Sequence, residues 1–484
     1  MLINKARKVI KNTFFLFSGN IIERIIGFFV ALLLVRYLGV GDFGKYSLIY
    51  AFLSFFQLCA AMGIDYFILR ELACDYKKGA QLLGSAVTLK IFLSLIGILL
   101  CWIILPWMNY ASDINMLIYV ASLSLLFSFG TLFNNIFQAK SAMEYIVGVN
   151  VSTKVSLVLC TVTLISLKAK LPYFIILNLL IYGIQIILAF YLSRRFLSFK
   201  IKINLAVWKV IMINSWPLII NGIFVSIYSR VDQLLLFHIK GNEALGFYAA
   251  AVKLIEAPLV IVGAFLTSVF PLLSQYAVTS GESFKEAYEA SFKYLMIFFS
   301  LIAMAATLFS RQITLVCYGN HFLPSSVAVA ILSWSTLFIS FSVMHTFLLL
   351  AISLQYLDII FMGFLAIVNL ILNLILIPIY GFMGAAVASL VSYSLVIPLS
   401  YSFKKTRMFA VAAIKAMFKP LTVALVTGYL VHSFLPLASI FKLIIAVFIY
   451  LLFMLIIKGI NSQDFRYLKE LLAKSTEADK CLNQ

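Results

Sequence analysis

Long apolar runs alternate with short polar breaks along the whole chain. Counting runs of about 20 apolar residues, the length that crosses the hydrocarbon core of a bilayer as a helix, gives fourteen segments. They span residues 12–38, 46–66, 84–106, 114–138, 146–167, 172–192, 210–238, 247–273, 293–317, 325–351, 357–378, 381–403, 415–434 and 438–458. The period-two alternation of a transmembrane barrel is absent. The pattern therefore predicts an all-α polytopic membrane protein with 14 transmembrane helices.

The longer polar breaks suggest how these helices are grouped. The basic segment 194–209 separates the first six runs from the next six, and the basic segment 404–419 precedes the last two. We expect an N-lobe over residues 1–193, a cytoplasmic basic linker over 194–209 and a C-lobe over 210–403. Residues 404–484 would hold helices 13 and 14 and a cytoplasmic tail.

A short glycine pattern occurs twice, about 200 residues apart. Residues 39–46 read GVGDFGKY and residues 241–248 read GNEALGFY, so Gly39, Gly44 and Tyr46 correspond to Gly241, Gly246 and Tyr248. Each copy follows the first helix of a six-helix half. Repeats of this kind are typical of transporters built from two lobes with a substrate path between them. The glycines would permit a sharp turn, and we expect both tyrosines at the headgroup level.

The composition and the loop charges fit this membrane assignment. The chain of 484 residues is 63% hydrophobic and only 11% charged, with 37 Lys and Arg against 18 Asp and Glu. With the N-terminus inside, the predicted outside loops hold only Lys45, Lys168, Lys170, Lys240 and Lys442, which predicts that both termini are cytoplasmic. The basic excess is therefore assigned to cytoplasmic loops rather than to nucleic-acid binding. The six cysteines and four histidines show no metal-ligand spacing, and neither a nucleotide-binding motif nor a cofactor motif is present.

Several charged residues fall inside apolar runs, where a charge is costly and usually faces protein or water. Arg24 lies halfway along the first run, Arg230 lies in the seventh and Lys253 lies in the eighth. We interpret these three as a cationic lumen between the lobes that binds an anionic group such as a phosphate or diphosphate. The alternatives are structural ion pairs, for example Lys253 with Glu256 at i,i+3. Four other cations, Arg36, Lys90, Lys154 and Arg311, are expected to reach a membrane interface.

Acidic and neutral polar residues in the runs complete the candidate set. Glu23, Asp65 or Glu256 is a candidate to bind a proton or Na⁺ and couple transport to an ion gradient. A second group is expected to line the lumen and to contact sugar hydroxyls: Gln57, Asn134, Asn135, Gln138 and Asp232. Asn369 and Asn373, at i,i+4, are interpreted as helix–helix hydrogen-bonding residues.

Three stretches resemble a known family. Residues 229–276 resemble helices 7 and 8 of the Wzx-type O-antigen and polysaccharide repeat-unit flippases, in the multidrug/oligosaccharidyl-lipid/polysaccharide exporter superfamily. RYLGVGDFGKYSL (36–48) and NLILNLILIPIYGFMGAAVASLVSY (369–393) resemble its helix 1–2 joint and its helix 11–12 segment. The matching positions in the first stretch are Arg230, Asp232, Gln233, Gly241, Gly246, Tyr248, Lys253, Glu256, Phe270 and Pro271.

The resemblance implies two pseudo-symmetric six-helix lobes plus two C-terminal helices, which open alternately to the two sides of the membrane. It implies that the cargo is an undecaprenyl-diphosphate-linked glycan, moved from the cytoplasmic to the periplasmic leaflet of the bacterial cytoplasmic (inner) membrane. It assigns Arg230 and Lys253 to the lumen by motif. Arg24 is assigned by its position in helix 1, where lipid II flippases of the superfamily have a similar basic residue.

Other functions remain open at this point. A cation-coupled drug or metabolite exporter and a lipid II flippase belong to the same superfamily. A membrane enzyme such as a polymerase or ligase would need a large outside loop, and every predicted outside loop is short. The expected partners are the lipid-linked glycan, membrane lipids and, in a surface-polysaccharide pathway, a polysaccharide polymerase and a chain-length regulator.

Overall fold

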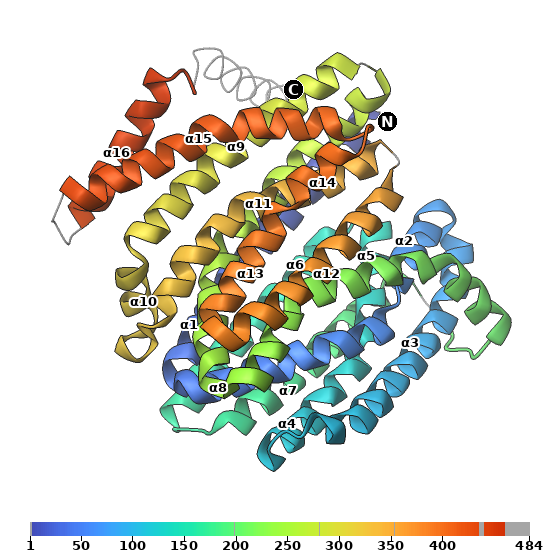
Figure 1. Cartoon of the computed structure of the whole chain (residues 1–484). Helices are drawn as coiled ribbons and strands as arrows, with labels where there is room; N and C mark the ends of the chain where they lie inside the picture. Colours follow the sequence, from blue (N-terminus) through green and yellow to red (C-terminus); the bar gives the residue numbers. More distant parts are fainter. Residues whose placement is uncertain (1, 198, 280, 353, 435–439, 460–484) are drawn as a thin grey trace.

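The computed structural model describes residues 2–197, 199–279, 281–352, 354–434 and 440–459, and all the regular structure in these ranges is helical (Figure 1). The predicted tail after residue 459 and the first two residues of the last predicted helix, 438 and 439, lie outside the described residues. Within these ranges, ten helices are long and apolar enough to cross a membrane, so the chain is a multi-pass membrane protein. The total of fourteen crossings and the limits of the four regions remain predictions.

The first part of the chain forms seven α-helices and two short 3₁₀ segments. They are α1 (Leu2–Ala61), α2 (Ile64–Cys74), α3 (Tyr76–Ile104), η1 (Leu105–Met108), α4 (Ser112–Ser122), η2 (Leu123–Gly130), α5 (Thr131–Ala139), α6 (Met143–Ser166) and α7 (Leu171–Ser193). Segments α4, η2 and α5 follow one another without a break and together cover the predicted run 114–138. This part is coloured blue to green in Figure 1.

The second part begins with a helix of 75 residues. Its elements are α8 (Leu205–Thr279), α9 (Gly281–Leu308), α10 (Ser310–Tyr318), η3 (Asn320–Phe322), α11 (Ser325–Ala351), α12 (Gln355–Tyr380), α13 (Phe382–Ser394), α14 (Val396–Ser402), α15 (Arg407–Phe434) and α16 (Ile440–Ile456). Each of the fourteen predicted runs therefore falls largely on one of the helices or on a continuous series of them.

Two glycines break the longest helices. Inside α1, Gly39 has φ 71° and ψ 179°, and inside α8, Gly241 has φ 82° and ψ −173°. A side chain would be strained at these backbone angles, which glycine adopts readily. Each long helix is thus two helical segments joined at a glycine, which confirms the turn predicted from the repeated pattern.

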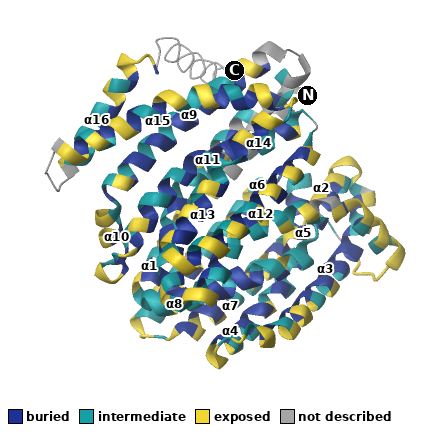
Figure 2. Cartoon of the chain, viewed as in Figure 1, coloured by how far each residue is buried: buried dark blue, intermediate teal, exposed yellow. Residues whose placement is uncertain are grey.

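Burial and exposure fit a bundle that sits in lipid. Buried clusters fill the interior of each part, and a smaller one joins α9, α15 and α16 through Met304, Val423 and Tyr450. Exposed residues recur along helices of both parts (Figure 2). Many of the exposed side chains are large and apolar, for example Leu99 on α3 and Phe448 on α16. Apolar surface of this extent indicates contact with acyl chains rather than with water.

Candidate functional site

A cluster of charges gathers where the two segments of α8 face each other. Lys253 Nζ lies 2.7 Å from one carboxylate oxygen of Glu256, and an Arg230 guanidinium nitrogen lies 3.8 Å from the other. The three side chains are between 34% and 41% exposed, so the cluster is accessible rather than sealed. The predicted i,i+3 pair is confirmed. It leaves Lys253 and Arg230 sharing the Glu256 carboxylate.

Arg24 brings a third cation to the same region from α1. Its charge acts on Glu256 together with those of Lys253 and Arg230, although the residues are far apart in sequence. The Arg24 side chain is exposed, and among the described residues it forms no ion pair or hydrogen bond. Direct contacts therefore join Arg230 and Lys253 at Glu256, and the common lumen of these two residues with Arg24 stays a prediction.

The depth of this cluster follows from the two glycine joints. Arg24 lies 15 residues before Gly39, and Glu256 lies 15 residues after Gly241. At about 1.5 Å of rise per residue, each lies about 22 Å from its joint along the helix axis. Lys253 and Arg230, at 12 and 11 residues from Gly241, lie about 16–18 Å from it. If both joints are at one membrane surface, these groups are at mid-membrane depth.

The two joints do lie together, because they pack directly against each other. A Cβ added to Gly44 would lie 1.9 Å from the backbone oxygen of Asn242, and one added to Gly246 would lie 2.1 Å from that of Val40. Only glycine allows this reciprocal backbone contact. Buried residues from both parts of the chain, among them Phe43 of α1, surround it. The repeated pattern therefore forms an interface that holds the joint ends of α1 and α8 together.

A cavity of about 290 Å³ lies within the first part of the chain, between α1, η2, α5 and α7. Two predicted lumen residues, Gln57 and Asn134, line it. The other lining residues are Tyr50, Leu53, Ser54, Ser124, Leu125, Phe127, Ser128, Gly130, Thr131, Tyr182, Gln185, Ile186 and Ala189. None of them is charged, so hydroxyl, amide and aromatic groups determine what this space can bind.

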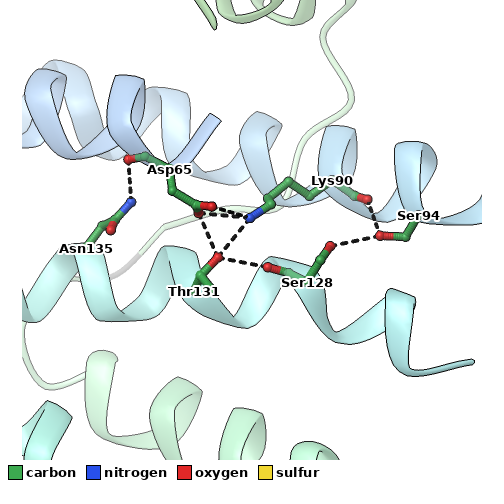
Figure 3. Close-up of polar contacts among 6 residues, drawn as sticks. All are labelled: Asp65, Lys90, Ser94, Ser128, Thr131 and Asn135. Atoms are coloured by element: carbon green, nitrogen blue, oxygen red, sulfur yellow. Dashed lines mark hydrogen bonds and ion pairs between the residues drawn. The ribbon is translucent and has the colours of Figure 1, made fainter. Parts of the chain in front are cut away.

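Next to the lining residue Thr131 lies an ion pair between a buried lysine and a partly exposed aspartate (Figure 3). Lys90 Nζ contacts both carboxylate oxygens of Asp65 at 2.8 and 2.9 Å and the hydroxyl of Thr131 at 2.8 Å, and Thr131 in turn donates to Asp65. The Lys90 side chain is only 1% exposed. The expectation that Lys90 reaches a membrane interface is wrong, because a carboxylate one helix away neutralises it inside the bundle.

Behind another wall, a second chain of hydrogen bonds includes Glu23. Asn150 donates to the Glu23 carboxylate at 3.1 Å, and Gln185 donates to the Asn150 amide oxygen at 2.9 Å. Of the three predicted coupling carboxylates, Asp65 and Glu256 have Lys or Arg partners, whereas the partner of Glu23 is a neutral amide.

Several predicted residues have structural rather than lumen positions. Asp232 is 5% exposed and accepts a hydrogen bond from the hydroxyl of Tyr248, which is 1% exposed. The expected headgroup position of Tyr248 and lumen position of Asp232 are therefore wrong: each satisfies the other's buried polar group. Tyr46 is half-buried, and its ring stacks on Phe43 and packs at a tilt against Tyr50.

Asn135 and Gln138 of α5 and two asparagines of α12 also lie away from the cavity. Asn135 is buried and donates to the backbone oxygen of Asp65 at 2.8 Å, and neither it nor Gln138 lines the cavity. On α12, Asn369 donates to Ser392 of α13 at 2.9 Å, which confirms its predicted helix–helix role, whereas Asn373 donates to Asn369 of the same helix at 2.9 Å. Sequence reasoning missed the cavity residues Tyr50, Tyr182 and Gln185. They are spread over two helices, and no spacing in the chain links them.

The fold has solved counterparts. The chain resembles a structure of the lipid II flippase MurJ in an inward closed conformation, with a TM-score of 0.74 and 16% identity over 93% of this chain and 99% of that one. It also resembles an inward-facing multidrug resistance MATE transporter of the MOP superfamily (TM-score 0.66, 15% identity, 81% and 96% covered). A MOP superfamily transporter from Pyrococcus furiosus gives a TM-score of 0.58 at 14% identity, with 83% and 96% covered. The architecture is thus the one these transporters share.

The family itself is shown by sequence. The profile of the polysaccharide biosynthesis protein family matches residues 9–277, more than half of the chain. The chain belongs to that family. No curated protein matches the sequence.

Proposed function

We propose that this chain is a flippase that moves an undecaprenyl-diphosphate-linked oligosaccharide across the bacterial cytoplasmic membrane by alternating access. The cargo is a repeat unit of O-antigen or of another surface polysaccharide. The observation that carries the proposal is the accessible cluster in which Arg230 and Lys253 share the Glu256 carboxylate; we infer that Arg24 adds a third cation from α1. Membership of a polysaccharide biosynthesis family and the shared transporter fold support it.

The chemistry of the cargo suits this cluster. A diphosphate carries at least two negative charges, and Arg binds phosphate oxygens in a bidentate geometry while Lys acts as a point charge. In the proposed cycle, the headgroup replaces Glu256 as the partner of Lys253 and Arg230, and Arg24 adds a third contact. The lipid tail stays in the bilayer. In this orientation both termini are cytoplasmic and the packed glycine joints face the periplasm.

The proposal includes coupling to a proton or Na⁺ gradient. Glu23 is the best placed of the three candidate carboxylates, because its partner Asn150 is neutral and leaves room for a bound cation or proton. A polysaccharide polymerase and a chain-length regulator would act on the product in the outer leaflet and are proposed partners.

A complementation experiment tests the proposal. In a strain lacking the gene, the chain should restore surface polysaccharide, and Arg24→Ala or Lys253→Ala should abolish that restoration while the protein remains in the membrane. Arg311→Ala on α10, an exposed cation away from the cluster, is the matched control and should complement normally. Full polysaccharide from both cluster variants would refute the cationic role.

A lipid II flippase is the second candidate, favoured by the likeness to MurJ over nearly the whole chain. Lipid II also combines a polyprenyl diphosphate with sugars, so the same cations would bind its diphosphate. Depletion separates the two: a lipid II flippase is needed for the cell wall, so its loss should lyse cells. Loss of a repeat-unit flippase should leave growing cells without the surface polysaccharide.

A further inference from the structure

We propose that the cavity between α1, η2, α5 and α7 is a subsite for the uncharged sugar residues of the glycan, separate from the cations that bind the diphosphate. This inference rests on the proposed function and adds a second recognition site to it. The cavity volume of about 290 Å³ is at the small end of the range for small-molecule sites, about 300–1,000 Å³. The space is therefore suited to one or two sugar rings rather than to a whole repeat unit.

The lining has the chemistry of a sugar site. Hydroxyl groups come from Ser54, Ser124, Ser128 and Thr131, and further polar and aromatic groups come from Tyr50, Tyr182, Phe127, Gln57, Asn134 and Gln185. Hydroxyls and amides both donate and accept hydrogen bonds, as sugar hydroxyls do. The aromatic rings offer flat apolar surface to the C–H faces of a sugar ring. A few convergent polar groups among apolar ones are the usual composition of a small-molecule site.

Other occupants fit less well. A diphosphate would be desolvated here without any lining cation to compensate it. A cationic drug would find no lining carboxylate, because Asp65 and Glu23 lie behind the wall and outside the lining. An acyl chain would leave the lining hydroxyls and amides without partners, which is costly in an apolar environment. An uncharged polar ligand can form hydrogen bonds with the lining hydroxyls and amides without these penalties.

Two of the lining groups are held in place from behind. Thr131 is fixed by the Asp65–Lys90 ion pair (Figure 3). Gln185 uses one amide hydrogen on Asn150, which is itself held by Glu23. Fixing these side chains before the ligand arrives lowers the entropy cost of binding. Asp65 and Glu23 thus each help to position a neutral group at the cavity wall.

Two other lining groups are available to a ligand. Among the described residues, the amides of Gln57 and Asn134 form no hydrogen bonds, although both line the cavity. Along α1 the cavity residues Tyr50 and Gln57 lie 11 and 18 residues after Gly39, which places them about 16–27 Å from the joint. This is the same depth as the cation cluster, so a headgroup and its attached sugars can occupy both sites at one level of the membrane.

The test compares two lipids on the purified full-length protein by native mass spectrometry. One is undecaprenyl diphosphate, and the other is the lipid-linked glycan that accumulates in the deletion strain. The intact protein should bind the glycan lipid at least about tenfold more tightly, a difference of about 1.4 kcal/mol. The double variant Gln57→Leu/Asn134→Leu should lose most of this ratio and bind undecaprenyl diphosphate unchanged. Gln312→Leu, exposed on α10 and outside the cavity, is the control and should keep the ratio.

The outcomes separate the two proposals. A ratio near one in the intact protein, or an unchanged ratio in a double variant with a normal melting temperature, would overturn the sugar subsite and leave the flippase proposal standing. Binding of neither lipid would overturn both. If the double variant unfolds, Ser124→Ala, which removes one hydroxyl from the wall, is measured instead and should lower the ratio without affecting undecaprenyl diphosphate.

Discussion

The contact between the two glycine joints leads to the sharpest prediction. Replacing Gly44 by Ala would place a Cβ 1.9 Å from the backbone oxygen of Asn242, whereas Cβ contacts below 3.0 Å essentially do not occur. The two joints must then separate by about 1.1 Å or more along this contact. Backbone atoms of two packed helices cannot turn aside as a flexible side chain can, so Gly44→Ala should disfavour the state in which the joints touch.

The expected size of the effect follows from overpacking. Forcing an extra methyl into a packed contact costs about 1–3 kcal/mol. In the proposed alternating-access cycle the joints would touch in one state and separate in the other, so this cost would fall on the touching state alone. A difference of about 1–3 kcal/mol shifts the equilibrium between the states by about 5- to 150-fold.

Double electron–electron resonance, which measures the distance between two spin labels, can detect this shift in the equilibrium between the two states. Spin labels on Asp42→Cys and Glu243→Cys, one exposed residue at each joint, in a background without native cysteines should give a short distance in the parent protein. Gly44→Ala should move most of the population to a longer distance. Gly263→Ala, on α8 with nothing within 4 Å of the added Cβ, is the control. An unchanged distance distribution in Gly44→Ala would refute the claim that the contact between the joints requires glycine at this position.

Three further substitutions test other parts of the structure by the melting temperature of the purified protein. Lys90→Met leaves the Asp65 carboxylate without its cation and should cost up to about 3 kcal/mol, less than in a fully buried pair because Asp65 is 28% exposed. Lys90→Met with Asp65→Leu should recover much of this, and a single variant as stable as the parent would contradict the role of the ion pair. Gly39→Ala forces a side chain into a glycine conformation and should cost about 1–3 kcal/mol, whereas Gly27→Ala, in open space, should be neutral. Asn369→Leu should cost about 0.6–1.7 kcal/mol through its lost bond to Ser392 without weakening undecaprenyl diphosphate binding; weaker binding would mean that Asn369 contacts the lipid.

The positions of most helices could be predicted from the sequence, because a lipid environment restricts which backbone structures are possible. In lipid, apolar runs must satisfy their backbone hydrogen bonds internally, so run length and turn residues locate the helices. Gly39 and Gly241 were also predictable as turns. The reciprocal contact of Gly44 and Gly246 with the opposite joint was not, since no local pattern reveals which surfaces meet.

Contacts of the candidate site could be predicted where both partners lie close together on one helix. Contacts between helices could not, because they depend on how the helices pack. Lys253 and Glu256 pair at i,i+3 on one helix, which spacing alone indicates. Lys90 was misplaced because its partner Asp65 lies on another helix, 25 residues away. Tyr248 and Asp232 were misplaced for the same reason: a buried pair and an exposed pair look alike in sequence.

The measurement that tests the central claim most directly is the affinity of the purified protein for undecaprenyl diphosphate compared with undecaprenol, which has the same tail without the charge. The protein should bind undecaprenyl diphosphate much more tightly than undecaprenol. Arg24→Ala and Lys253→Ala should each remove most of this preference. Equal binding of the two lipids, or a preference that survives both substitutions, would contradict the proposal that these cations bind the diphosphate.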